Sequence, residues 1–187
     1  MVLSRYGAAV RWQRLFEDLE AQLDLEAAAE LRAEVADRTR AEQADVWLAD
    51  RLRAAGEVAV HLSDGAVVAG RVEDAAPEWV VLAEARGQAL VPLAAVSSVS
   101  GLPRRVAPPA GAVLRRTSLR TALRALARDR APVRVAVAGA ELAGTVDRVA
   151  GDHVDLALHP PGEPRRAGAV LEVRAVALAA LLVVRSA

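Results

Sequence analysis

Hydrophobic and polar positions alternate with a period of two along two separate stretches of the chain, and each stretch predicts five short strands. In the first stretch, the alternation predicts strands at 58–62, in a run ending at 72, and at 79–82, 89–93 and 96–99. In the second stretch, the expected strands are 133–138, 140–149, 153–158, 169–175 and 177–184. Five short strands in succession are typical of a small β-barrel.

The two stretches are copies of one unit. Residues 65–83 align without a gap on residues 139–157, and the alignment pairs Gly70 with Gly144. In a small barrel one long strand must bend and a neighbouring strand must approach it closely, which a residue without Cβ permits. We therefore interpret Gly70 and Gly144 as structural glycines, and the chain as a tandem repeat.

Two segments have the pattern of helices instead. No proline or glycine occurs between 8 and 54, and leucines recur there near helical spacing until Gly56 supplies a stop. This acidic segment is expected either to form a helix or helical hairpin that packs on the rest of the chain, or to form a coiled-coil or partner-binding arm. Further along, Ser118 is suited to cap a helix with Leu119 and Leu123 on its apolar face.

These patterns predict an α+β, mainly β fold with two tandem five-stranded barrels, the second preceded by a short helix. The expected division is a helical arm at 1–55, a first barrel at 56–102, a linker at 103–117 and a second unit at 118–187. The linker is rich in proline, glycine and alanine, as linkers between compact units often are.

Composition excludes several classes of function. The chain has 187 residues and no net charge. It has no cysteine, which excludes disulfides and thiolate chemistry. All basic residues are arginine, which rules out a P-loop lysine, and no hydrolase or dinucleotide motif occurs. No apolar run reaches the roughly 20 residues of a membrane span. We expect a cytoplasmic, noncatalytic protein without cofactor, metal or membrane partner.

The run 123–157 resembles the Sm-like (LSm) fold, and within it the bacterial Hfq RNA chaperones. The resemblance lies in a helix ending Ala-Leu-x-Arg-Asp-Arg-x-Pro-Val at 125–133, followed by a strand, a turn glycine and the glycine at 144. It implies oligomeric rings, closed by pairing the fourth strand of one unit with the fifth strand of the next. It also implies RNA binding on two faces and on an arginine rim, which Arg128 and Arg130 match.

The other RNA surfaces of that family are not carried over. The glutamine-phenylalanine pair of the uridine-binding face falls here at Asp152-His153, and in the first unit at Glu78-Trp79. The tyrosine-lysine-histidine signature of the fourth strand is absent from both units. The rim is therefore the surface on which an RNA-binding hypothesis depends.

Charge is concentrated around the same helix. Residues 103–134 hold nine arginines and one acidic residue, and several arginines recur at steps of four, opposite the leucine face. One interpretation is a stripe that follows the backbone of single-stranded RNA. The other is a solvated face, or a face that pairs with the acidic arm or another acidic protein surface. The residues of the RNA-binding hypothesis are Arg120, Arg124, Arg128 and Arg130; the alternative function is a protein-interaction or oligomeric scaffold module.

Three further positions carry weaker hypotheses. Trp79 is expected to anchor a barrel or an interface rather than to stack on a base. Asp152 and His153, with a neighbouring aspartate, offer metal donors without a convincing spacing. Pro92 falls in a predicted fourth strand, where it donates no hydrogen bond, so that edge is expected either to be oriented outward or to be blunted against pairing. Because the two units are covalently joined, they could pair with each other. Self-association of the chain through barrel edges or through the N-terminal helix is a further hypothesis.

Overall fold

A computed structural model describes most of the chain: residues 46–108, 116–160 and 170–186, with 111, 114 and separate positions between 22 and 38. Contacts between Cα atoms divide the chain into two compact units, residues 1–46 and residues 47–187. In the first part, the described residues between 22 and 38 are helical and almost all exposed. Within the described residues, no helix has the length and apolar character needed to cross a membrane.

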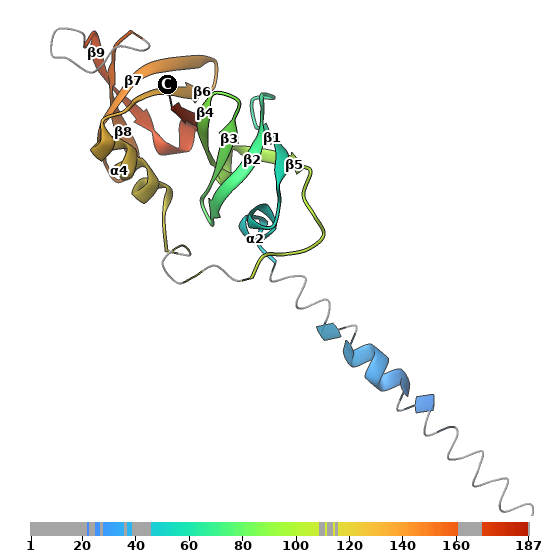
Figure 1. The fold of residues 1–187 in the computed structure, drawn as a ribbon. Coiled ribbons are helices and arrows are strands. Elements are labelled where there is room, and N and C mark those ends of the chain that lie inside the picture. Colours follow the sequence, from blue (N-terminus) through green and yellow to red (C-terminus); the bar gives the residue numbers. More distant parts are fainter. Residues whose placement is uncertain are drawn as a thin grey trace, which may run out of the picture. The chain divides into compact units, whose positions relative to one another are not determined.

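The second part is built on one antiparallel sheet of ten strands (Figure 1). The strands of the first half are β1 (Glu57–Leu62), β2 (Val67–Ala76), β3 (Trp79–Glu84), β4 (Gly87–Pro92) and β5 (Val96–Ser100). Those of the second half are β6 (Pro132–Val137), β7 (Ala140–Val149), β8 (His153–Leu158), β9 (Glu172–Ala177) and β10 (Leu181–Ser186). Their order across the sheet is β5-β1-β2-β3-β4-β10-β6-β7-β8-β9.

The prediction of five strands in each half is confirmed, but the sheet is not closed into barrels. Within a half, the fifth strand pairs with the first, and the fourth strand never pairs with the fifth. The edge of β4 is instead used by β10, so the halves join into one continuous sheet. An unpaired strand edge exposes backbone donors and acceptors. The pairing of β4 with β10 covers one such edge on each half.

The last two strands begin and end later than predicted. The alternation placed them at 169–175 and 177–184, whereas β9 is Glu172–Ala177 and β10 is Leu181–Ser186. Between them lies a 3-10 turn, η2 (Leu178–Ala180), with the same Leu-Ala-Ala sequence as η1 (Leu93–Ala95) of the first half. The break between the strands was placed too early, because the run from Val176 to Val184 has no polar residue to mark it.

A helix precedes the strands of each half. Helix α2 (Leu48–Arg53) packs on β2, and α4 (Leu119–Asp129) packs on β7. The helix expected to continue unbroken to 54 is interrupted, because Trp47 is extended, with φ −87° and ψ 148°. Helix α2 has only six residues, and it is stabilised by the burial of Ala49 and Leu52. In a short helix, tertiary packing of an apolar face contributes more stability than local helix propensity.

The hydrophobic core crosses from one half into the other. The core of the first half includes Leu182 and Val183 of β10, both almost inaccessible to solvent. The core of the second half includes Trp79 and Leu90 of the first half. Each half therefore completes its core with side chains of the other.

Gly70 and Gly144 occupy matching positions in the long strands β2 and β7. A Cβ on Gly70 would clash with the backbone of Ala83, its carbonyl carbon lying at 3.0 Å. A Cβ on Gly144 would meet the backbone of Ala157 in the same way, with the carbonyl carbon at 2.9 Å. Because glycine has no Cβ, the third strand of each half lies closer to the long strand than any other residue at these positions would allow.

Candidate nucleic-acid interface

Helix α4 positions the candidate arginines. Its N-cap is Ser118, whose hydroxyl accepts a hydrogen bond from the amide of Thr121 at 3.3 Å. Leu119 and Leu123 are buried against the sheet, whereas Arg120 and Thr121 between them are exposed. Because the helix begins at Leu119, Arg116 lies before it and does not extend the row of helical arginines.

The row consists of Arg120, Arg124 and Arg128, all exposed. Residues four apart on a helix lie about 6 Å apart along its axis, on nearly the same face. Arg120 makes a long hydrogen bond to the carbonyl of Gly151 at 3.5 Å. Across the described residues, no carboxylate pairs with Arg120, Arg124 or Arg128. Among the described residues, the row is therefore available to an anion.

Arg130 ends the helix in an unusual conformation. Its φ is 49° and its ψ is 27°, in the left-handed region. Among the described residues, no other residue except glycine has a positive φ. For a residue with a Cβ this region costs about 1–2 kcal/mol. The side chain is exposed and has no ion-pair partner within the described residues. Such strain is often retained where a side chain has a function.

A hollow of about 440 Å³ lies beside the row, between α4 and β7. Arg124 and Arg128 line it from the helix, and Asp147 and Arg148 line it from the strand. Arg148 donates to a carboxylate oxygen of Asp155 at 2.9 Å, so its charge is partly compensated. The hollow is lined by three arginines and one aspartate, and this excess of positive charge suits phosphate oxygens. Nothing in the sequence pattern had placed Arg148 beside the helix.

Glu78 and Trp79 both form hydrogen bonds to the start of α4. The carboxylate of Glu78 accepts from the amide of Leu119 at 2.8 Å, and the indole Nε1 of Trp79 donates to the carbonyl of Thr117 at 3.2 Å. Trp79 is only 6% exposed. Both side chains fasten the start of α4 to the first half, so Trp79 has no free face for a base. Its expected role as an anchor is thus the one that these contacts support.

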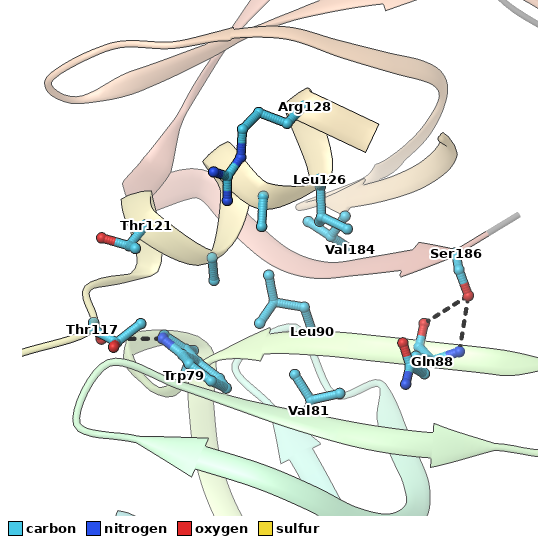
Figure 2. A pocket seen from close by; sticks show the side chains of 12 residues that line it. Trp79, Val81, Gln88, Leu90, Thr117, Thr121, Leu126, Arg128, Val184 and Ser186 are labelled. Atoms are coloured by element: carbon cyan, nitrogen blue, oxygen red, sulfur yellow. Dashed lines mark hydrogen bonds between the residues drawn. The ribbon is translucent and has the colours of Figure 1, made fainter. Parts of the chain in front are cut away.

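A second hollow, of about 330 Å³, lies between α4 and the first half (Figure 2). Most of its lining is apolar, including Leu90, Leu126 and Val184. Arg128 lines it from the helix, while Gln88 and Ser186 are hydrogen-bonded to each other at the far end. The hollow follows the seam where the two halves meet.

The remaining sequence candidates form local pairs. His153 Nδ1 lies 2.7 Å from a carboxylate oxygen of Asp152, and this hydrogen bond holds the pKa of Asp152 below its ordinary value. His153 Nε2 is 3.8 Å from a carboxylate oxygen of Asp155. Among the residues that the structure describes, no group of three or more histidine or acidic side chains could hold a metal ion.

One histidine is buried in the second half. His159 is 3% exposed, and its Nδ1 lies 3.1 Å from the carbonyl of Pro160. That carbonyl can only accept, so Nδ1 carries the proton and Nε2 accepts from the hydroxyl of Thr145 at 2.8 Å. Both ring nitrogens are satisfied, which makes this a structural pair.

Comparison with protein-family models, with curated proteins and with solved structures finds no match to this chain.

Proposed function

We propose that the chain is a noncatalytic tandem Sm-like protein that binds single-stranded RNA through Arg120, Arg124, Arg128 and Arg130. The observation that carries the RNA proposal is the exposed arginine row on α4, which has no carboxylate partner among the described residues. Arg130 caps the end of the same helix, and the adjoining hollow adds Arg148. Exposed arginines on successive turns of a helix make a positive surface that favours the binding of an anion.

The strand arrangement supports the Sm-like part of the proposal. The resemblance implies a helix followed by five strands, with the fourth strand of one unit paired to the fifth of the next. Each half here has a helix before its five strands, and β4 of the first half pairs with β10, the fifth strand of the second.

The arginine surface predicts how RNA would be bound. Trp79 is buried and does not stack on a base, so the free energy of binding at the arginine surface is mainly electrostatic. Contacts to about four phosphates of a single strand predict a log-log salt slope near −3. Little preference for sequence is expected.

The test is RNA binding at low salt, measured by fluorescence anisotropy with a labelled single strand. We expect the double variant Arg124→Glu, Arg128→Glu to lose binding. The matched control is Arg71→Glu, Arg86→Glu, which changes the net charge equally on the first half and should retain most of the affinity. Thermal melts verify that each variant is folded.

Two results would overturn the RNA proposal: no retention of RNA by the unmodified protein at low salt, or an equal loss in both double variants. If the unmodified protein instead bound an acidic polypeptide through Arg124 and Arg128 while ignoring RNA, the surface would belong to a protein-interaction module. Copurifying nucleic acid that is sensitive to RNase would favour RNA directly.

A further inference from the structure

The hollow of about 330 Å³ between α4 and the first half has a mainly apolar lining (Figure 2). Val81 and Leu90 line it from the first half, and Ala125, Leu126 and Val184 line it from the second. Val81, Ala125 and Leu126 are only half-buried, so part of their apolar surface remains in contact with solvent. A ligand with an apolar body would remove that surface from water, which favours binding.

Arg128 is the only charged residue among the described residues that line this hollow. Its side chain is exposed, and no carboxylate pairs with it in the part of the chain that the structure describes. Figure 2 shows the side chain reaching back along α4, beside the apolar lining. At the far end the amide of Gln88 already donates to the hydroxyl of Ser186 at 2.9 Å. The hollow therefore combines an apolar surface with one cation that has no counter-charge there.

This combination selects the chemistry of a ligand. A guanidinium group binds a carboxylate through two parallel hydrogen bonds, and it repels a cation. The apolar lining favours a hydrocarbon chain, whereas hydroxyl or amide groups would lose their hydrogen bonds to water without replacement. Ligand pockets are commonly apolar, with a few polar groups that fix the orientation of the ligand. The hollow thus suits an aliphatic monocarboxylate.

The volume of the hollow limits the length of the hydrocarbon chain. Ligand pockets usually measure about 300–1,000 Å³, so this one is at the small end of the range. At about 30 Å³ for each water-sized group, it holds about eleven such groups. Octanoate, with about ten non-hydrogen atoms, is of this size. Acetate is too short to reach the apolar lining from a guanidinium group.

We propose that the hollow binds an aliphatic carboxylate of about eight carbons, with its carboxylate on Arg128 and its chain against Leu90, Leu126 and Val184. Leu90 belongs to the first half, and the other three residues belong to the second. The ligand therefore contacts both halves and stabilises the seam between them. This inference does not depend on RNA binding, although Arg128 also belongs to the arginine row.

Binding is measured by isothermal titration calorimetry on the full chain, after RNase treatment so that no RNA occupies Arg128. The probes are octanoate below its micelle-forming concentration, 1-octanol and acetate. We expect saturable binding of octanoate at a single site, binding of 1-octanol that is weaker by about tenfold or more, and no binding of acetate. Octanoate should also raise the melting temperature, because a ligand that binds only the folded state stabilises it. Absence of octanoate binding, or equal affinity for octanoate and 1-octanol, would overturn the proposal.

The role of the charge is tested with Arg128→Gln. This variant should bind octanoate only as weakly as 1-octanol, while its affinity for 1-octanol stays unchanged. Arg128→Lys keeps the positive charge and should retain part of the affinity for octanoate. The matched control is Arg104→Gln, which removes an exposed arginine outside the hollow and should bind octanoate as the unmodified chain does. Unchanged octanoate binding by Arg128→Gln contradicts the proposal.

The location of the hydrocarbon chain is tested with Ala125→Leu, which fills the hollow without changing any charge. We expect this variant to lose octanoate binding. The matched control is Ala127→Leu, the same change on the same helix, at a position that lines the hollow between α4 and β7 instead. Thermal melts verify that both variants are folded. If both bound octanoate as tightly as the unmodified chain, the ligand would lie elsewhere and the proposal would be wrong.

Discussion

Gly144→Ala tests whether the repeated glycine is required by close approach of the strands. A Cβ at this position would lie 2.9 Å from the carbonyl carbon of Ala157, 3.2 Å from the Cα of Leu158 and closer still to the carbonyl oxygen of Ala157. All three atoms belong to the backbone of β8, so no side-chain rotation can relieve the overlap. Strand β8 must move away from β7, which weakens the hydrogen bonds between them.

The expected cost follows from that movement. Overpacking of a closely packed interior typically costs about 1–3 kcal/mol, and a rigid backbone neighbour puts this case at the upper end, about 3 kcal/mol. For a protein of this size, 3 kcal/mol lowers the melting temperature by roughly 6–12 °C. Gly70→Ala should cost a similar amount, because its Cβ would meet the backbone of Ala83 in the same way.

The assay is thermal and urea unfolding followed by circular dichroism. The matched control is Gly151→Ala, since a Cβ there would have nothing within 4 Å and φ is not positive. That variant should be unchanged or more stable by up to about 1 kcal/mol, through lower entropy of the unfolded chain. If Gly144→Ala were as stable as Gly151→Ala, the steric argument would be wrong.

Three other substitutions or conditions have expected outcomes. Arg130→Gly relieves the left-handed strain and should raise the free energy of unfolding by about 1 kcal/mol, measured in urea, while lowering RNA affinity. Trp79→Phe removes the indole donor to Thr117 and should cost about 1–2 kcal/mol in the same assay. Because His153 lowers the pKa of Asp152 from its ordinary 3.8, the stability that this pair contributes is present above that pH and is lost as pH falls through the lowered value. Asp152→Asn should remove this component from the acid side of a stability–pH curve, and an unaltered curve would contradict it.

Much of the fold could be predicted because each half repeats a simple pattern. Alternation in β1 and β6, together with turn residues such as Ser63, Asp64 and Gly65, marks the strands without reference to tertiary structure. The pattern cannot say which edges pair, because the pairing of β4 with β10 joins residues almost a hundred positions apart. It therefore predicted two barrels where the chain forms one sheet.

The candidate site was predicted less completely. The spacing of Arg120, Arg124 and Arg128 was enough to put them on one exposed helical face. By contrast, the sequence places Glu78 and Trp79 beside each other without indicating that both reach α4, some forty residues later. Such long-range hydrogen bonds leave no periodic signal, so the sequence indicated an anchoring role for Trp79 but not the helix that it anchors.

The exchange of core residues between the halves has a consequence for folding during synthesis. Leu182 and Val183 complete the core of the first half, although nearly ninety residues separate them from the end of β4. At a typical translation rate of about 5–20 residues per second, the first half waits roughly 5–18 s for them. During that interval the edge of β4 and the apolar surface around Leu90 are open to solvent. The early half is therefore exposed to misassociation on the ribosome, and slow elongation would prolong the exposure.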